Sequence, residues 1–417
     1  MKVLILGAGI IGMATAFYLQ RRNHHVLILD RESVPGRVSS YMNGGQFSYS
    51  YAEPLASPSM LRQLPSLLLG RQGALKITPA AYPEIIPWGL RFMRQCSADQ
   101  QKANTRRVLR LARLSREEML RYIDEQTPDF DFRQTGKLHL YRDPLQLQRA
   151  APLVELKNSL GFGQEIWSPQ RCLAAEPALA DYPGSLAGGI FSPLDQSGDS
   201  FKLIQSLRED CLRSGRCEFQ LSTQVNGFMA QGAVITGIRT TQGETSADAY
   251  VLCAGAESPR LLQGLGMRLP ILPIKGYSIT VPALAGAPVI NLTDTQHKIV
   301  FTRLGDRLRV AGLMEFAGWN RSVDQEPVEH LLRLAEKVLP AAGDYSRLDD
   351  YWAGLRPMTP DGAPIIGPTR WGNLWLNTGH GMLGSTLALG SARHLADVLD
   401  GKPSQLREGE YRAERFA

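Results

Sequence analysis

Three closely spaced glycines near the start of the chain could hold a dinucleotide. Gly7, Gly9 and Gly12 follow an apolar run over residues 2–6 that is typical of a buried parallel strand. Gly7 permits a tight turn, Gly9 leaves room for a pyrophosphate, and Gly12 lets a helix pack closely against the sheet. The N-terminus of that helix would offer unpaired N–H groups and a partial positive charge to the phosphates.

The residues that follow complete a βαβ unit around these glycines. We expect a helix over residues 13–22 and a second strand over residues 26–29, which ends on Asp30. The Asp30 carboxylate is then placed to accept hydrogen bonds from the adenosine ribose hydroxyls. Asp30 argues against a 2′-phosphate, whereas the adjacent Arg31 would tolerate one. The motif alone does not separate NAD from FAD.

The composition is that of an ordinary globular protein with room for two domains. The chain has 417 residues, of which 43% are hydrophobic and 21% charged, and its formal net charge is +6. This mild positive charge allows weak attraction to anionic lipid headgroups, and no motif favours nucleic acid.

The cysteines indicate a reducing compartment. They number five, no CxxC occurs and no histidine cluster accompanies them, so we expect neither a disulfide framework nor a metal site. The first strand begins at residue 2, which leaves no room for a signal peptide. No apolar run approaches the roughly 18 residues of a membrane span. We expect a cytoplasmic protein, and peripheral contact with the cytoplasmic face of the inner membrane is an open alternative.

Later segments must position the rest of the site. The polar, Gly-rich residues 31–50 suit close passage along an extended cofactor, and residues 51–95, rich in proline and apolar residues, predict short helices and turns. This second segment is either packing under a lid or a patch that faces a membrane or a partner. We expect helices over 101–125, over 201–213 with Asp199 as its cap, over 328–338, and at the end of the chain to about Leu399. Expected strands are 136–141, 188–191, 219–225, 233–240, 249–255, 275–280, 299–302, 308–312 and 373–377.

Several motifs in this order resemble the D-amino-acid oxidase-like flavoproteins. They are GAGIIG at the start, LCAG in the middle, and GLRPMTPDGAPIIG and NTGHGMLG near the end. Within that superfamily, SYMNGGQFSYSYAEP, PLDQSGDS and PIKGYSIT are similar to the bacterial D-amino-acid dehydrogenases. The resemblance covers nearly the whole chain. One departure is Gly44, where the family usually has alanine.

The resemblance implies an α/β fold with a discontinuous Rossmann-like FAD-binding domain. This domain would comprise residues 1–50, 198–258 and 352–417. Residues 51–197 and 259–351 would form an α+β substrate-binding domain on a large mixed, mainly antiparallel sheet.

The resemblance also assigns residues to the cofactor, which would be bound non-covalently because no cysteine follows Cys253. Val225 would meet the adenine through its backbone, and residues 379–386 would place a helix N-terminus at the flavin N1–C2=O edge. The expected FAD-binding residues are Gly7, Gly9, Ile10, Ile11, Gly12, Asp30, Arg31, Ser40, Asn43, Gly44, Gly45, Val225, Ala254, Gly255, Gly381, Met382, Leu383, Gly384, Ser385 and Thr386.

Five residues match positions that handle the substrate. Arg356 would bind the substrate carboxylate through its planar fork. Tyr277 would bond the same carboxylate, and Tyr51 and Gln46 would line the pocket, with buried core tyrosine as the alternative for both tyrosines. His380 either takes part in catalysis or holds its turn in place.

The activity implied is oxidative deamination of a D-amino acid by hydride transfer from Cα to flavin N5, which yields a 2-oxo acid and ammonium. Electrons would pass to a quinone or another acceptor. The alternatives are an oxidase of glycine, sarcosine or D-amino acids that uses O₂, and a dehydrogenase specialised for D-proline or hydroxyproline. A NAD-binding reductase and a non-enzymatic flavin-binding subunit are the alternatives of a different class.

Overall fold

The computed structural model describes residues 1–61, 75–78 and 82–416 of the chain. Strand β1 (Lys2–Leu6), helix α1 (Ile10–Gln20) and strand β2 (His25–Leu29) form the expected βαβ unit. Helix α1 begins at Ile10, three residues before the predicted start. Gly9 is its N-cap, and a Cβ on Gly12 would lie only 1.8 Å from the Gly7 carbonyl oxygen, so the helix starts directly against the strand.

A six-stranded sheet is built around this unit, in the order β19-β20-β13-β1-β2-β9. Its strands run parallel, except that β19 is antiparallel to β20. The added strands come from distant segments of the chain: β9 (Cys217–Gln220), β13 (Ala249–Leu252), β19 (Ile365–Pro368) and β20 (Leu374–Thr378).

The strand predicted over residues 219–225 is wrong. Strand β9 ends at Gln220, and the chain re-forms a strand only at β10 (Val225–Gln231), which belongs to a three-stranded sheet with β11 (Val234–Thr240) and β12 (Gly243–Thr245). Between them Ser222 has a φ of 52°, and its N–H donates to the Glu32 carbonyl. This turn breaks the extended run and carries the chain from one sheet to the other.

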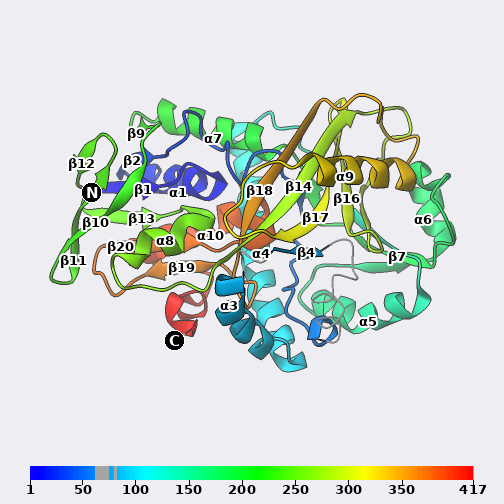
Figure 1. The fold of residues 1–417 in the computed structure, drawn as a ribbon, viewed down its shortest axis with the longest axis horizontal. Coiled ribbons are helices and arrows are strands. Elements are labelled where there is room, and N and C mark those ends of the chain that lie inside the picture. Colours follow the sequence, from blue (N-terminus) through cyan, green and yellow to red (C-terminus); the bar gives the residue numbers. More distant parts are fainter. Residues whose placement is uncertain (62–74, 79–81, 417) are drawn as a thin grey trace.

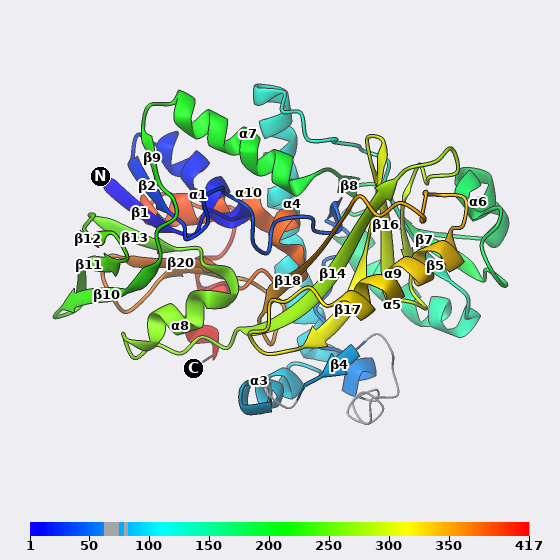
Figure 2. The same ribbon diagram turned by 45° about the horizontal axis from the view of Figure 1, so that its top comes forward.

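One layer of helices covers the six-stranded sheet. Helix α1 packs between α7 (Ser200–Arg213) and α10 (Gly384–Leu399), and α4 (Ala98–Gln126) packs on α10 (Figures 1 and 2). Asp199 caps α7, as predicted, by accepting hydrogen bonds from two backbone N–H groups. The resulting core joins apolar residues of α1, α4, α7 and α10 to one face of the sheet.

The second large sheet has nine strands among the described residues, in the order β18-β14-β17-β16-β15-β5-β7-β6, with β4 paired to β17. It is antiparallel except at the β15–β5 and β17–β4 pairs. The α/β fold, with a parallel sheet beside a mixed and mainly antiparallel one, is confirmed, whereas the predicted domain boundaries stay a prediction. The strands are β4 (Leu75–Ile77), β5 (Lys137–Tyr141), β6 (Glu165–Trp167), β7 (Gly188–Ser192), β14 (Leu272–Pro282), β15 (Asn291–Asp294), β16 (Ile299–Leu304), β17 (Arg307–Phe316) and β18 (Asp350–Met358).

The two faces of this sheet have different neighbours. Tyr277 and Ile279 on β14 pack with Leu331 on α9 (Gln325–Val338), which covers one face. Gly276 and Ser278 alternate with them and therefore face the other side, toward the six-stranded sheet. The Ser278 hydroxyl donates to the Met42 carbonyl there.

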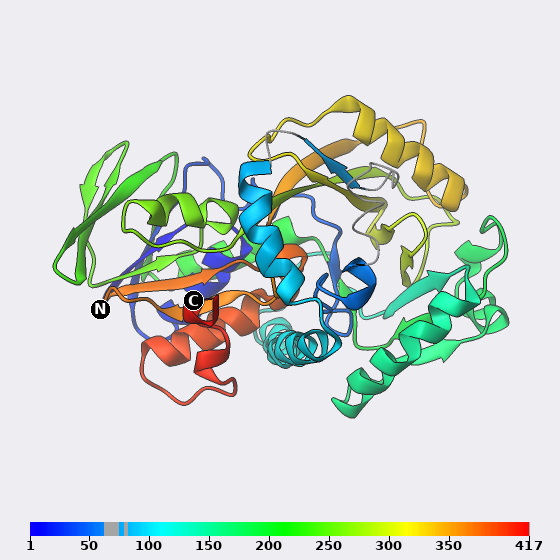
Figure 3. The ribbon, with the colours of Figure 1, turned by 60° about the horizontal axis from the view of Figure 1, so that its bottom comes forward.

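The remaining elements close the space between the two sheets. Figure 3 shows α3 (Tyr82–Arg94) and α4 near the middle of the molecule, and α5 (Pro144–Ser159) beside the nine-stranded sheet, where it packs on β5 and β7. Part of the segment predicted to form short helices and turns, residues 62–74 and 79–81, lies outside the described residues. The other elements are β3 (Gln46–Phe47), β8 (Gln196–Ser197), α6 (Pro169–Ala175), α8 (Ser258–Gln263) and the 3₁₀ turns η2 (Pro177–Leu179), η3 (Gly255–Glu257), η4 (Gly381–Leu383), η5 (Glu408–Glu410) and η6 (Ala413–Phe416).

Candidate active site

A cavity of about 2590 Å³ lies between the two large sheets. Its size exceeds the roughly 300–1,000 Å³ of a pocket for one small ligand, so it has room for an extended cofactor and a substrate together. Gly12 and Gly45, two of the predicted site residues, are not part of its wall. The predicted residues that do line it are Gly7, Gly9, Ile10, Ile11, Asp30, Arg31, Ser40, Asn43, Gly44, Gln46, Tyr51, Val225, Ala254, Gly255, Tyr277, Arg356, His380, Gly381, Met382, Leu383, Gly384, Ser385 and Thr386.

The glycine turn after β1 is shaped to receive a phosphate group. Gly7 has a φ of +107°, and a Cβ there would lie 2.7 Å from the Cys253 carbonyl oxygen. Gly9, the N-cap of α1, has no side chain that could fill this part of the cavity or cap the helix. The Ser40 hydroxyl accepts a hydrogen bond from the Ile10 N–H at 3.1 Å, whereas the next N–H groups of the first turn have no partner within the helix. These donors fit a pyrophosphate.

Asp30 ends β2 at the cavity, as predicted. Its two carboxylate oxygens accept hydrogen bonds from the backbone N–H groups of Ala8 at 2.6 Å and Glu32 at 2.9 Å. Burial raises the pKa of this carboxyl, and the two N–H groups oppose that effect. Each oxygen retains acceptor capacity for the predicted ribose contact. The neighbouring Arg31 is engaged with Glu32 and Glu257.

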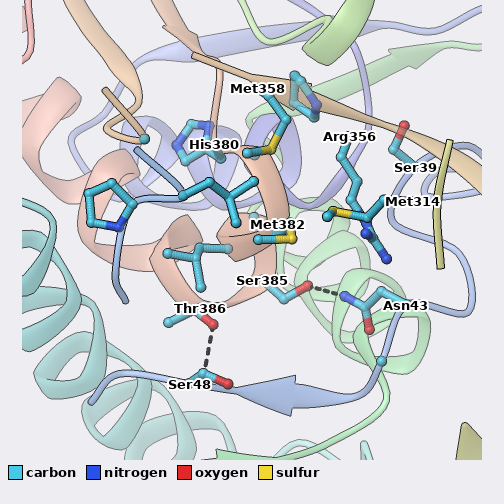
Figure 4. A pocket seen from close by; sticks show the side chains of 18 of the residues that line it. Ser39, Asn43, Ser48, Met314, Arg356, Met358, His380, Met382, Ser385 and Thr386 are labelled. Carbon is cyan, nitrogen blue, oxygen red and sulfur yellow. Dashed lines mark hydrogen bonds between the residues drawn. The ribbon is translucent and has the colours of Figure 1, made fainter. Parts of the chain in front are cut away.

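Hydrogen bonds hold the segment after Ser40 against the start of α10 (Figure 4). Asn43 Nδ2 donates to Ser385 Oγ at 2.6 Å, and the Ser48 N–H donates to Thr386 Oγ1 at 3.0 Å. On the sheet side, Gly44 leaves just enough room for Val300, because a Cβ on Gly44 would lie 3.2 Å from the Val300 side chain. The loop is therefore fixed between α10 and the nine-stranded sheet.

The N-terminus of α10 opens into the cavity without a side-chain cap. Gly379 and Gly381 before it have φ values of +78° and +57°, which allow the tight turn. The first N–H groups of the helix and its dipole therefore present a partial positive charge to whatever occupies the cavity. This arrangement suits an oxygen or nitrogen atom on which negative charge develops.

Arg356 on β18 points into the cavity and forms no hydrogen bond or ion pair with the described residues (Figure 4). Burial lowers its pKa to about 10, so it stays charged at neutral pH. The guanidinium lies over the backbone of Gly276, where an added Cβ would be 2.3 Å from Arg356 Cζ. A half-buried guanidinium in a cavity wall, without a protein partner, is suited to bind a carboxylate.

His380 lines the cavity, but its hydrogen bond is directed into the core. Its Nε2 lies 3.1 Å from Ser391 Oγ on α10, and that hydroxyl donates to the Ala388 carbonyl. Burial lowers the pKa of His380 to about 3, so the ring is neutral. In Figure 4 Met358 lies between His380 and Arg356, and the backbones of Met358 and His380 form a β-bridge. This geometry favours the alternative in which His380 holds its turn.

The predicted contact between Tyr277 and a substrate carboxylate does not agree with the structure. The Tyr277 hydroxyl donates to Glu315 Oε2 at 2.7 Å, and its ring packs in the core under α9. Because Tyr277 follows Gly276 in an extended strand, its side chain leaves β14 on the face opposite to the Arg356 guanidinium. Tyr277 is thus the buried core tyrosine of the alternative interpretation.

Tyr51 and Gln46 agree better with their predicted place in the cavity wall. Tyr51 is 37% exposed, and this exposed surface faces the cavity, while its ring stacks on His139 at 3.9 Å between ring centroids. Gln46 donates through Nε2 to the carbonyls of Leu292 and Phe301, which turns its amide toward the sheet.

Two residues that shape the site were not predicted. Gly276 is required under Arg356, and a glycine inside an expected strand is a sequence signal for such close approach. Trp88 on α3 donates its indole N–H to the Met358 carbonyl at 3.0 Å, which packs α3 on the end of β18 next to Arg356. No local pattern pairs Trp88 with a residue so distant in the chain.

Comparisons with known proteins agree with this geometry. The model of the family described as FAD dependent oxidoreductase (DAO) matches residues 2–398. A curated "D-amino acid dehydrogenase" of Paramagnetospirillum magneticum is 41% identical and covers 100% of this chain and 99% of its own length. A second protein of that name, from Rhizorhabdus wittichii, is 39% identical and covers 100% of both chains.

Solved structures support the same fold. An L-proline dehydrogenase from P. horikoshii aligns with a TM-score of 0.78 at 18% identity and covers 100% of this chain and 97% of its own. A glycine oxidase from Geobacillus kaustophilus aligns with a TM-score of 0.76 at 21% identity, with 99% and 97% coverage. At these identities the likeness establishes the fold alone. The match of the family model over nearly the whole chain, together with the full-length relatives, shows that the chain belongs to the DAO family of FAD-dependent oxidoreductases, and its cofactor is FAD.

Proposed function

We propose that the protein is a dehydrogenase that oxidises D-amino acids to 2-oxo acids and ammonium and passes the electrons to an acceptor other than O₂. The single observation that carries this proposal is Arg356, a half-buried guanidinium that points into the cavity and has no partner among the described residues. An amino-acid carboxylate would satisfy its two outer N–H groups in parallel. The names of the full-length relatives support the D-amino acid as substrate.

The glycine cradle and Asp30 would hold the ADP half of FAD, and Ser40, Asn43 and Gly44 would lie along its pyrophosphate and flavin. Bound FAD supplies a two-electron acceptor for the hydride on the substrate Cα. The N–H groups at the start of α10, from Gly384 to Thr386, would stabilise negative charge that develops at their end of the cavity. Val225 and the Ala254–Gly255 turn would contact the cofactor through their backbones.

The protein side chains would act mainly by orientation. Arg356 would hold the carboxylate so that the Cα–H bond points toward the cofactor, and Tyr51 and Gln46 would bound the space for the side chain. His380 would keep the turn before α10 in place through Ser391. The substrate reacts with its amine neutral, so loss of the hydride leaves an iminium ion, which water hydrolyses to the 2-oxo acid and ammonium. The hydride-transfer step itself therefore needs no dedicated general base on the protein.

We further propose that the acceptor is a quinone reached from a membrane surface that α3 contacts. Ile86, Leu90 and Met93 on one side of α3 are 61%, 55% and 44% exposed, and Arg91 and Arg94 stand beside them. An amphipathic helix with this pattern suits the interface of an anionic membrane. Among the described residues, none of the helices is long and apolar enough to cross a bilayer.

The membrane part is tested with lipid vesicles. Ile86→Gln/Leu90→Gln should abolish co-sedimentation with anionic vesicles while leaving flavin reduction unchanged. If the unaltered protein does not bind anionic vesicles at low salt, the membrane contact is wrong, and the substrate proposal is unaffected.

The substrate proposal is tested by the visible spectrum of the purified protein under anaerobic conditions. Addition of D-alanine should bleach the flavin band, and L-alanine should not. Arg356→Lys should retain FAD but lose roughly 10²–10³-fold in kcat/KM, because a single ammonium cannot replace the bidentate fork. A flavin band that no D-amino acid bleaches would overturn the proposal. Slow reoxidation in air is the result expected of a dehydrogenase, and rapid reoxidation with peroxide formation would identify an oxidase instead.

A further inference from the structure

A second cation lines the cavity from another strand of the nine-stranded sheet. Lys137 begins strand β5 and is only 4% exposed. Its ammonium donates to Ser48 Oγ at 3.0 Å, and no carboxylate of the described residues lies within ion-pair distance of it. Keeping a charge out of water with a single neutral hydrogen-bond partner is costly, so an anion in the cavity would stabilise this ammonium.

Hydroxyl groups with unused hydrogen bonds surround this lysine. Tyr51 and Tyr141 line the cavity, and their hydroxyls form no hydrogen bond with the described residues. The Tyr51 ring lies across the ammonium, with 4.9 Å between Lys137 Nζ and the ring centroid. Burial raises the pKa of both tyrosines, so they remain hydrogen-bond donors at neutral pH.

The acidic residues near this end present no free carboxylate to the cavity, because Asp195, whose Oδ2 has no hydrogen-bond partner, is not part of the cavity wall. Glu53 pairs with Lys157, and Asp195 Oδ1 accepts a hydrogen bond from the Ser50 N–H at 2.7 Å. The free groups at the wall are therefore donors, and they match a ligand group with several acceptor atoms and a negative charge.

This end of the cavity is nevertheless close to the reacting centre. The Ser48 hydroxyl accepts from Lys137, and the Ser48 N–H donates to Thr386 Oγ1 at 3.0 Å in the first turn of α10. Lys137 is thus two hydrogen-bonded contacts from the helix start that would face the flavin. Four strands separate β5 from β18, which carries Arg356, so the two cations enter the cavity from different parts of the same sheet.

We propose that Lys137, with Tyr51 and Tyr141, forms a subsite for a carboxylate at the end of the substrate's side chain. The preferred substrates are then D-amino acids with an acidic side chain, bound by Arg356 at the α-carboxylate and by Lys137 at the far end. This inference rests on the proposed function. Because four strands lie between those that carry the two cations, a longer acidic side chain should fit better, in the order D-2-aminoadipate, D-glutamate, D-aspartate.

The subsite should weaken in alkaline solution. Burial lowers the pKa of Lys137 to about 8, with Asp195 and Glu53 opposing this effect and Lys157 adding to it. The other groups that face Lys137 are the Ser48 hydroxyl and the rings of Tyr51 and His139. They are uncharged near neutral pH, because burial raises the pKa of Tyr51 and lowers the pKa of His139. Selectivity for acidic side chains should be full well below pH 8 and disappear as the pH rises through that value.

The first test measures binding without turnover. Adipate and its half-amide, adipamic acid, are titrated into the FAD-loaded protein, and the dissociation constants are read from the flavin difference spectrum. Adipate should bind at least tenfold more tightly than the half-amide. Lys137→Met should remove this difference by weakening adipate alone. Equal affinities in the unaltered protein would overturn the proposal, and this comparison requires no variant to fold.

The second test measures selectivity in turnover. The ratio of kcat/KM for D-glutamate to that for D-glutamine should exceed ten in the unaltered protein and fall to about one in Lys137→Met. Arg149→Gln removes the same charge from an exposed position of α5 at the rim of the cavity, so it should preserve the ratio. A ratio that falls equally in both variants would mean general electrostatic attraction and overturn the subsite.

These outcomes separate the inference from the function on which it rests. If D-alanine and D-glutamine bleach the flavin and D-glutamate or D-2-aminoadipate bleach it no better, the proposed subsite is wrong. The proposal of D-amino-acid oxidation is then unaffected. If no D-amino acid bleaches the flavin, the proposed function itself is wrong.

Discussion

The two ends of the cavity recognise their ligands by different means. At the βαβ end, the wall is backbone: glycines without side chains and the uncapped N-terminus of α1. At the nine-stranded sheet, the wall carries two cations, the half-buried Arg356 and the buried Lys137, that lack carboxylate partners among the described residues. Backbone recognition requires one short segment with a fixed conformation, whereas the cations come from strands far apart in the chain.

This difference has a consequence for substitution. A side chain added in the glycine turn should act on the cofactor and on folding, because it collides with backbone. A change at the sheet should act on substrate selectivity while the flavin stays bound, because the sheet's core under α9 is separate from the cavity face.

The largest effect is expected at Gly12. A Cβ in Gly12→Ala would lie 1.8 Å from the Gly7 carbonyl oxygen, so α1 must move away from β1, and we expect loss of nearly all bound flavin. The ratio of flavin to protein absorbance measures this. Gly9→Ala is the matched control, since its nearest contact is the Ser40 hydroxyl at 3.3 Å, and it should retain the fold with weakened FAD binding. Normal flavin content in Gly12→Ala would contradict the view that the βαβ end binds its ligand through closely packed backbone.

A smaller effect, confined to the substrate, is expected at Gly276. The Cβ of Gly276→Ala would lie 2.3 Å from Arg356 Cζ and displace the guanidinium. Misplacing a substrate anchor by about 1 Å costs roughly 10–100-fold in kcat/KM. Steady-state kinetics should show this loss with unchanged flavin content. Gly264→Ala has open space around its Cβ and serves as the control. If Gly276→Ala loses flavin instead, the two ends are not independent.

His380 should make the protein sensitive to acid. Its pKa is about 3 in the folded state because of burial, against about 6.5 when unfolded, so the unfolded chain binds the extra proton first as the pH falls. The free energy of unfolding should drop by about 2 kcal/mol from this residue between pH 7 and pH 5. Denaturant unfolding of the protein and of His380→Gln at both pH values isolates the effect. An equal pH dependence in both would contradict the assignment.

The smallest effect is expected at Tyr277. Tyr277→Phe removes the hydrogen bond to Glu315 and should lower the free energy of unfolding by about 1 kcal/mol. It should leave KM for the substrate unchanged, because the hydroxyl lies on the α9 side of the sheet. A large rise in KM with normal stability would restore Tyr277 to the carboxylate site.

The sequence predicted the cofactor end well because its signals are local. The strand, the glycines and Asp30 lie within thirty residues, and each has a conformational requirement that its residue type reveals. The cap of α7 at Asp199 could be predicted for the same reason, because it depends only on neighbouring residues of the chain. The strand predicted over residues 219–225 failed because the apolar pattern continues through a turn that only the partner strand and the hydrogen bonds to residues 30 and 32 impose.

The substrate end depended on tertiary structure. The resemblance to known flavoproteins placed Arg356 in the site, but which face of β14 the Tyr277 side chain takes is decided by strand pairing, since a shift of one residue exchanges the two faces. The sequence by itself determined a dinucleotide cradle at the start of the chain, because its glycines and Asp30 require no distant partner. Only the tertiary structure decided that Gly276 lies under Arg356, that His380 is buried against Ser391, and that Lys137 reaches the same cavity. Burial and partners, which set the charge and direction of these side chains, exist only once the sheets have formed.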